Sequence, residues 1–252
     1  MCGRYTLFIA TEQIYRYFGI ANPPSEVTDT DLKPSWNVAP QSFQPVIRLN
    51  LMTWQREMVQ MRWGLVPFFS KEPTHSYSTI NARAETILDK PIFREPMRKR
   101  RCLVPVNSYF EWRVTDPDSK RKQPWVIGLA SGEPFALAGI WDHWENKDRT
   151  IQLETFAIIT CEPNILLRSL HDRMPVLIHP EDYDRWLDPG DPKNPPMDLL
   201  KPFPDGLMKI CPVKPAVGNP RNNRSDLIDP INLDDSGKID DRDNSDDQPR
   251  LF

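Results

Sequence analysis

The chain has 252 residues, of which 39% are hydrophobic and 27% charged, and it carries a formal net charge of -3. This length and composition predict a soluble globular protein with a sizeable core. No run of about 18 apolar residues occurs, and no basic start precedes an apolar stretch, so we expect neither a membrane span nor a secretion signal.

The predicted elements begin with a helix from Thr11, in which Ile14, Tyr15 and Phe18 fall on one face and Gly19 marks the end. Short apolar segments of strand length then recur between turn residues. They are 45–51, 58–63, 102–112, 125–129, 135–144, 156–161, 175–178 and 207–213. Short helices fit best at 84–88, 92–99, 164–170 and 181–187. This order predicts a mostly antiparallel α+β domain.

The end of the chain differs in charge from the rest. Residues 226–252 hold nine Asp, no Glu and three basic residues, so residues 1–225 carry a net charge of +3. We expect one domain over 1–230 and an acidic, disordered tail over 231–252, because the tail has too little apolar content to pack. The alternative function for the tail is a mimic of DNA charge that competes for the basic face.

Cysteine usage limits the site chemistry. The four cysteines at positions 2, 102, 161 and 211 are far apart, with no C-x-x-C pair and no histidine at metal-ligand spacing. We therefore expect no metal, no cofactor and no disulfide, and a cytoplasmic protein with reduced thiols. Cys2 is the most informative of the four, because removal of Met1 would leave a thiol and an amine on one residue. That pair can trap an aldehyde, whereas the alternative is a small residue tolerated at a chain end.

Polar side chains inside apolar surroundings mark three further candidates. Glu111 lies between Phe110 and Trp112, and strand alternation either turns it outward or leaves it half-buried. His171 has an ordinary pKa suited to proton transfer near neutral pH, although a lone histidine is often structural. Asn81 either caps a helix that starts at Ala82 or contacts a substrate.

Seven segments together resemble the SOS response-associated peptidase family, which includes abasic-site processing proteins. They are Met1-Cys2-Gly3-Arg4, Asn37-Val38-Ala39-Pro40, Trp63-Gly64-Leu65-Val66-Pro67, Ile80-Asn81-Ala82-Arg83-Ala84-Glu85-Thr86, Phe110-Glu111-Trp112, His171-Asp172-Arg173-Met174-Pro175 and Ala216-Val217-Gly218-Asn219. In order and spacing they extend from residue 1 to about 230. The resemblance implies a single domain with a barrel-like β core, and a protein that crosslinks itself to abasic sites in single-stranded DNA.

The resemblance also implies roles for single residues. Cys2 would be the nucleophile, and Asn81, Glu111 and His171 its catalytic partners. DNA would be contacted by Arg4, Arg83, Asn37, Pro40 and Thr160, the two arginines holding phosphates. Family members often carry a Trp pair after the Trp-Gly segment, whereas this chain has Phe68-Phe69, so Phe69 would stack on bases in its place. We expect a monomer that associates with the nucleoid during DNA damage and needs no metal or membrane.

Two other functions are compatible with the residues. Cys2 could serve as the N-terminal nucleophile of a peptidase that acts on other proteins, with Glu111 and His171 as its acid and base. Alternatively, the chain could be a non-enzymatic reader of modified DNA bases, which would leave Cys2 without a role. Met1 would be removed by an aminopeptidase or by attack of the Cys2 thiol on the preceding peptide bond.

Overall fold

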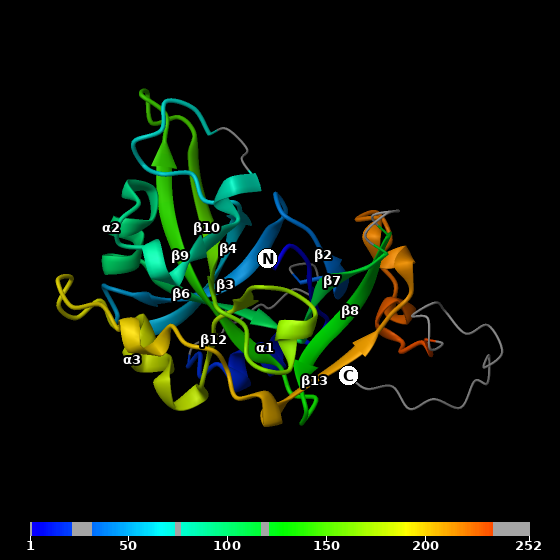
Figure 1. The fold of residues 1–252 in the computed structure, drawn as a ribbon. Coiled ribbons are helices and arrows are strands. Elements are labelled where there is room, and N and C mark those ends of the chain that lie inside the picture. Colours follow the sequence, from blue (N-terminus) through cyan, green and yellow to red (C-terminus); the bar gives the residue numbers. More distant parts are fainter. Residues whose placement is uncertain (1, 22–31, 74–76, 117–120, 234–252) are drawn as a thin grey trace.

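A closed β-barrel forms the centre of the computed structural model, which describes residues 2–21, 32–73, 77–116 and 121–233. Five strands make the ring in the order β3 (Phe43–Asn50), β4 (Gln55–Trp63), β10 (Gln152–Cys161), β9 (Phe135–Glu145) and β6 (Arg101–Val106), and β6 pairs with β3 to close it. Figure 1 shows these strands grouped on one side of the molecule. The prediction of an α+β fold with a barrel-like core is confirmed.

Large apolar side chains fill the barrel. The strands alternate between inside and outside, so every second residue points into the ring. Fully buried members from the five strands include Ile47, Met61, Trp63, Leu103, Ile140, Phe156 and Ile158. Trp63 stacks on Phe156 with ring centroids 6.3 Å apart. The barrel is therefore a packed core rather than a channel.

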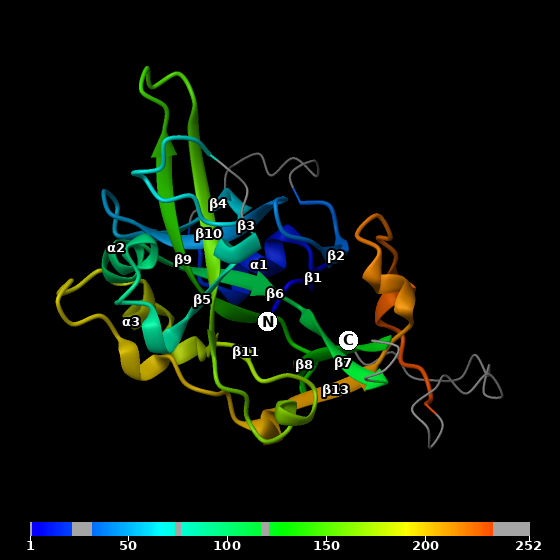
Figure 2. The same ribbon diagram turned by 45° about the horizontal axis from the view of Figure 1, so that its top comes forward.

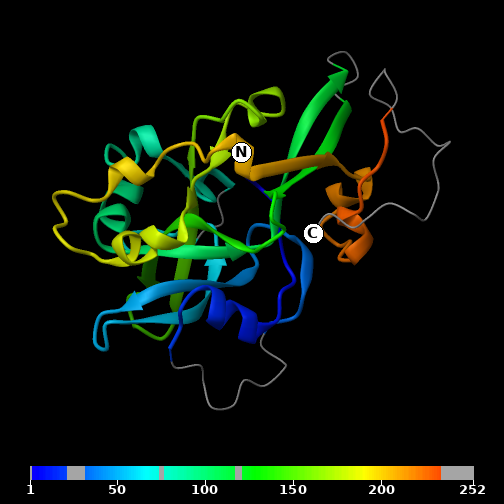
Figure 3. The ribbon, with the colours of Figure 1, turned by 90° about the horizontal axis from the view of Figure 1, so that it is seen from below.

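A second, five-stranded sheet lies beside the barrel. Its order is β13 (Met208–Pro212), β8 (Arg121–Leu129), β7 (Ser108–Asp116), β1 (Tyr5–Leu7) and β2 (Ser35–Val38). β1 pairs with β2 on one side and with β7 on the other, and it contacts the barrel strand β6. Figure 2 shows these strands beside the barrel, near the N-terminus. The far face of this sheet is covered by the 3₁₀ turns Pro215–Gly218 and Ser225–Ile228, and Phe110, Val126 and Val217 belong to the small core between them. Figure 3 shows this C-terminal segment in orange, beyond the β7–β8 hairpin.

Short helices and edge strands complete the fold. The helices are α1 (Thr11–Tyr17), α2 (Pro91–Lys99) and α3 (Tyr183–Leu187), and the remaining strands are β5 (Asn81–Arg83), β11 (Met174–Pro175) and β12 (Leu177–Ile178). Most strand pairs are antiparallel, as expected, but β10 runs parallel to both β4 and β5. None of the helices in the described residues is long and apolar enough to span a membrane.

The segment 102–112, predicted as one strand, is two strands in two different sheets. The break is at Asn107, whose side-chain oxygen accepts the backbone N–H groups of Phe8 and Ile9 at 2.8 and 3.3 Å. The backbone N–H of Asn107 donates to the Thr6 carbonyl at 2.9 Å. One polar residue thus carries the chain from the barrel to the sheet that holds β1.

Three other sequence predictions need correction. The predicted helices at 84–88 and 164–170 are only 3₁₀ turns, over Ala84–Thr86 and Leu167–Ser169. The predicted strand 175–178 is divided into β11 and β12. Strands β1, β2 and β5 were not predicted, because three or four residues are too few to show a periodic pattern. The state predicted for the acidic tail lies almost wholly outside the described residues.

Candidate functional site

Cys2 lies just before β1, where the barrel and the second sheet meet. Its backbone carbonyl accepts a hydrogen bond from the Asn81 side-chain amide at 2.8 Å. Its side chain is completely buried. Burial, reinforced by the nearby Glu111 charge, raises the pKa of the Cys2 thiol far above its usual range. At neutral pH the thiol is therefore protonated, and its use as a nucleophile requires a base.

Asn81 reaches Cys2 because it begins strand β5 rather than capping a helix. β5 pairs in parallel with β10, with Asn81 opposite Ile158, and this pairing fixes the backbone at the barrel rim. The predicted cap at Ala82 is wrong, since residues 81–83 are extended and the Asn81 amide donates to Cys2 instead. The Asn81 side-chain oxygen is buried and has no hydrogen-bond partner within the described part of the chain. It is an available acceptor beside Cys2.

Glu111 is buried, with only 4% of its surface exposed, so the outward orientation considered from sequence is wrong. The reason is that β7 lies between two cores. Phe110 belongs to the small core on one face of the strand, and Glu111 follows Tyr109 on the opposite face toward the barrel. Burial raises the pKa of Glu111 to about 7, an effect that the charge of the amino terminus partly offsets. Both protonation states are populated near neutral pH.

His171 approaches the same region from the loop before β11. Its neighbour Asp172 is close enough to Glu111 for its charge to raise the Glu111 pKa. Burial lowers the pKa of His171, so the ring is neutral at neutral pH. Its Nδ1 accepts the Arg173 backbone N–H at 3.0 Å, which places the ring proton on Nε2. Nδ1 also lies 2.7 Å from an Asp172 oxygen, a contact that is a hydrogen bond only when Nδ1 carries a proton, as in the other neutral tautomer or the charged ring.

An ion pair joins the His171 loop to the 3₁₀ turn that follows β5. Arg173 donates to both oxygens of Glu85 at 2.8 Å and to the Thr160 backbone carbonyl at 2.6 Å. The Arg173 hydrogen bonds lower the pKa of Glu85, so this carboxylate stays charged. Sequence reasoning assigned no role to Glu85 or Arg173, although both lie in the segments that carry the resemblance.

Arg4 and Asn37 form a buried clamp with the C-terminal segment. Arg4 donates to the Asn37 side-chain oxygen at 2.7 Å, and also to the carbonyls of Val217 and Gly218. The Asn37 amide nitrogen donates to three carbonyls of residues 217, 219 and 222 at 2.9–3.1 Å. Asn37 therefore orients Arg4 and fixes the segment over β2.

The other residues expected to contact DNA differ in how far their side chains are exposed. Arg83 has an exposed side chain, and Pro40 is partly buried. Thr160 is completely buried, and its hydroxyl makes a long 3.5 Å hydrogen bond to the Ala82 carbonyl. Phe69 is about half exposed and packs edge-on against Phe68, with ring centroids 5.3 Å apart. Phe68 is equally exposed, and sequence reasoning did not select it as a separate contact.

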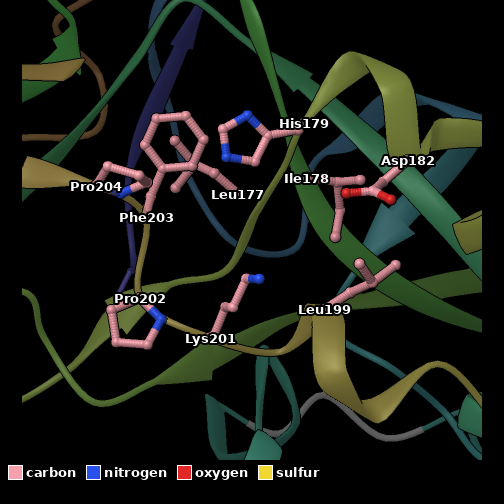
Figure 4. A pocket seen from close by; sticks show the side chains of 9 residues that line it. All are labelled: Leu177, Ile178, His179, Asp182, Leu199, Lys201, Pro202, Phe203 and Pro204. Atoms are coloured by element: carbon pink, nitrogen blue, oxygen red, sulfur yellow. The ribbon is translucent and has the colours of Figure 1, made fainter.

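A cavity in the described part of the chain lies away from Cys2. It has a volume of about 150 Å³ and is lined by Leu177, Ile178, His179, Asp182, Leu199, Lys201, Pro202, Phe203 and Pro204. Figure 4 shows His179 beside Phe203, and their rings stack 4.4 Å apart. None of the site candidates lines this cavity. Among the described residues, no group of three or more His, Cys, Asp or Glu side chains is arranged to hold a metal.

Comparison with known proteins shows the family. A sequence model of the SOS response associated peptidase (SRAP) family matches residues 1–220. The chain belongs to this family. Abasic site processing protein YoqW of Bacillus subtilis is 37% identical over 233 residues, covering 91% of this chain and 99% of YoqW. Abasic site processing protein HMCES of Mus musculus is 30% identical over 275 residues, covering 92% of this chain and 77% of HMCES.

A solved structure shares the SRAP chain's fold. An X-ray structure of a protein from Bacteroides thetaiotaomicron superposes with a TM-score of 0.79 at 28% identity, covering 92% of this chain and 100% of that one. A second, from Bordetella bronchiseptica, gives a TM-score of 0.68 at 25% identity. The overall fold is therefore common to this chain and these solved structures.

Proposed function

We propose that this SRAP chain recognises abasic sites in single-stranded DNA and binds them covalently through Cys2 once Met1 has been removed. The observation that carries the proposal is the convergence on Cys2 of a buried carboxyl and a buried amide. Glu111 is electrostatically coupled to the thiol, and Asn81 holds the Cys2 carbonyl. The relatives named above are abasic site processing proteins, which supports the same substrate.

The chemistry uses both functional groups of an N-terminal cysteine. An abasic sugar in its ring-opened form presents an aldehyde, to which the amine adds with loss of water to give an imine. The Cys2 sulfur then attacks the imine carbon and closes a five-membered thiazolidine, while the thiol proton moves to the nitrogen. The second attack is intramolecular, so it gains a large proximity advantage. The product is more stable than a simple imine.

Glu111 has the environment of a proton carrier for these steps. With a pKa of about 7 it accepts a proton from the amine or thiol and returns one to the departing hydroxyl. His171, neutral with its proton on Nε2, donates to the sugar O4 during ring opening. Because the Cys2 thiol resists ionisation, we place amine attack before sulfur attack.

DNA is held by contacts that carry no sequence information. Arg4, already oriented by Asn37, and the exposed Arg83 contact phosphates next to the lesion. Phe68 and Phe69 offer exposed rings on which unpaired bases stack. Pro40 is partly accessible and lies in the same proposed contact surface, whereas Thr160 is completely buried and is not proposed to touch DNA. We place the protein in the cytoplasm as a monomer that joins the nucleoid during DNA damage.

The decisive experiment uses a single-stranded oligonucleotide with one abasic site. We expect the processed wild-type protein, verified by mass spectrometry to lack Met1, to give a heat-stable shifted band. Cys2→Ala keeps a small second residue and a free amine but no thiol, so it should give only an adduct that requires borohydride for trapping. Cys211→Ala, which removes a buried cysteine of the small core, is the matched control and should crosslink normally.

Two outcomes would contradict the proposal. One is the absence of any heat-stable adduct with the processed wild-type protein. The other is an equally stable adduct with Cys2→Ala, which would assign the crosslink to another nucleophile. Release of peptides from an unrelated protein, in place of crosslinking, would favour a peptidase. Protein that retains Met1 should form no thiazolidine, because its Cys2 amine is in a peptide bond.

A further inference from the structure

Two tyrosines belong to the same buried core as Cys2 and take no part in the chemistry described so far. Tyr5 on β1 and Tyr109 on β7 are direct partners across the antiparallel pair. Their side chains therefore share one face of the sheet, the face that also carries Glu111. Both are completely buried in the barrel-side core together with Cys2. Tyr5 is held against Trp63, with ring centroids 5.2 Å apart.

The hydroxyls of both tyrosines are buried without a hydrogen-bond partner among the described residues. Such a group disfavours folding, because it loses its hydrogen bonds to water and gains none. Tyr183 gives a contrast within the same chain, since its buried oxygen accepts a hydrogen bond from the Ala136 backbone. Two unsatisfied hydroxyls on one face of the same sheet are more simply explained by a functional partner than by packing.

Both tyrosines lie close enough to Cys2 for its charge to act on them. Beyond the effect of burial, the Cys2 charge raises the pKa of Tyr5, and the charges of Glu111 and Cys2 raise that of Tyr109. Both phenols therefore keep their protons at neutral pH and remain hydrogen-bond donors. A thiol that is buried and hard to ionise gains most from donors placed where its negative charge develops.

We propose that Tyr5 and Tyr109 are catalytic residues of the ring-closing step, whose hydroxyls donate hydrogen bonds to the Cys2 sulfur as it attacks the imine carbon. This role rests on the covalent function proposed above. The carbon–sulfur bond forms, the π electron pair of the imine moves to nitrogen, and the thiol proton reaches that nitrogen through Glu111. The tyrosines give up no proton, so the step is balanced without them.

The experiment separates imine formation from ring closure under single-turnover conditions with the abasic oligonucleotide. Samples quenched with borohydride report all covalent species, and samples heated without it report the thiazolidine alone. Tyr5→Phe, Tyr109→Phe and the double variant are compared with wild type and with Tyr183→Phe. We expect unchanged imine formation but ring closure slowed by roughly tenfold or more per hydroxyl, since hydrogen bonds to a charged group are worth that factor.

Thermal unfolding gives a second test, because variants that slow ring closure should not be less stable than wild type. Removing an unpartnered buried hydroxyl should leave Tm unchanged or raise it for Tyr5→Phe and Tyr109→Phe, whereas Tyr183→Phe should lower it. If the double variant closes the ring at the wild-type rate, the proposal is wrong. A fall in Tm for both single variants would also overturn it, because the hydroxyls would then have structural partners. Failure of the wild type to form any adduct would instead refute the covalent function itself.

Discussion

Glu111 and Glu85 are both glutamates, but their pKa values are shifted in opposite directions in two regions of this molecule. Glu111 lies at the floor of the site, 4% exposed, where burial raises its pKa to about 7. Glu85 lies at the rim, where half of its side chain is exposed and the Arg173 hydrogen bonds lower its pKa. The floor therefore holds a carboxyl that changes charge near neutral pH, and the rim holds one that stays charged.

The difference comes from where the backbone places each residue. At Glu111, β7 is covered on both faces, so the carboxyl is largely shielded from water. Glu85 is in a 3₁₀ turn at the surface, where water and Arg173 both favour the charged form. A group that carries protons near neutral pH needs the buried environment of Glu111. A carboxylate that holds two loops together by an ion pair needs the exposed environment of Glu85. The predictions below test this division of roles.

The largest expected effect is on the rate of crosslinking by Glu111→Gln. Glutamine keeps the size of the side chain but cannot carry a proton, so we expect single-turnover crosslinking to slow by about 100-fold or more. Glu85→Gln is the matched control, a loss of the same charge at the rim, and should slow the reaction by less than about threefold. If the two variants have similar rates, the division between floor and rim is wrong.

The second prediction concerns stability against pH. The folded pKa of Glu111 is about 7, above its unfolded value of about 4.3, so its neutral form stabilises the fold below about pH 4. This contribution, on the order of 3 kcal/mol, is lost as the pH rises through 7. Denaturant unfolding of wild type and Glu111→Gln at pH 5 and pH 8 measures it. Wild type should lose more stability over this range, and parallel losses would contradict the assigned pKa.

A comparison of β7 with β5 shows which strands can be predicted from the sequence and which cannot. The apolar segment 102–112 was predicted to be extended, although as one strand rather than as β6 and β7. It could not show that both faces of β7 are covered, because the second cover comes from residues 215–228. β5 was missed altogether, since three residues pairing in parallel with a distant strand leave no local pattern. The barrel strands, being long and apolar, were predicted from composition and period alone.

The grouping of site residues was predicted only through the family resemblance. No spacing rule connects Cys2 with Asn81, which meet across a hydrogen bond between residues 79 positions apart. The orphan hydroxyls of Tyr5 and Tyr109 could not be predicted, because whether a buried hydroxyl finds a partner depends on the final packing. Residues that act through tertiary contacts, such as Arg173, are missed for the same reason.

A third prediction concerns the clamp between Asn37 and the C-terminal segment. Asn37→Ala leaves three backbone carbonyls and the Arg4 guanidinium without this partner, so we expect a loss of about 2 kcal/mol in the free energy of unfolding. It should also weaken binding to an intact single strand, because Arg4 is no longer oriented. Denaturant unfolding and salt-dependent binding measure the two effects. Asn223→Ala removes an exposed hydrogen bond to the Trp36 backbone and is the control. It should change the free energy of unfolding and the binding affinity less than Asn37→Ala does.

The smallest expected effect is the stability cost of breaking the rim pair. The side chain of Glu85 is half exposed, so water screens its attraction to Arg173, and Glu85→Gln should lower the free energy of unfolding by less than about 1 kcal/mol. Its folded pKa is lowered, so this contribution is present above about pH 4.3 and disappears as the pH falls below that value. Denaturant unfolding at pH 7 and pH 3 measures both parts. A difference between wild type and variant that is larger at pH 3 than at pH 7 would reverse the sign and refute the assignment.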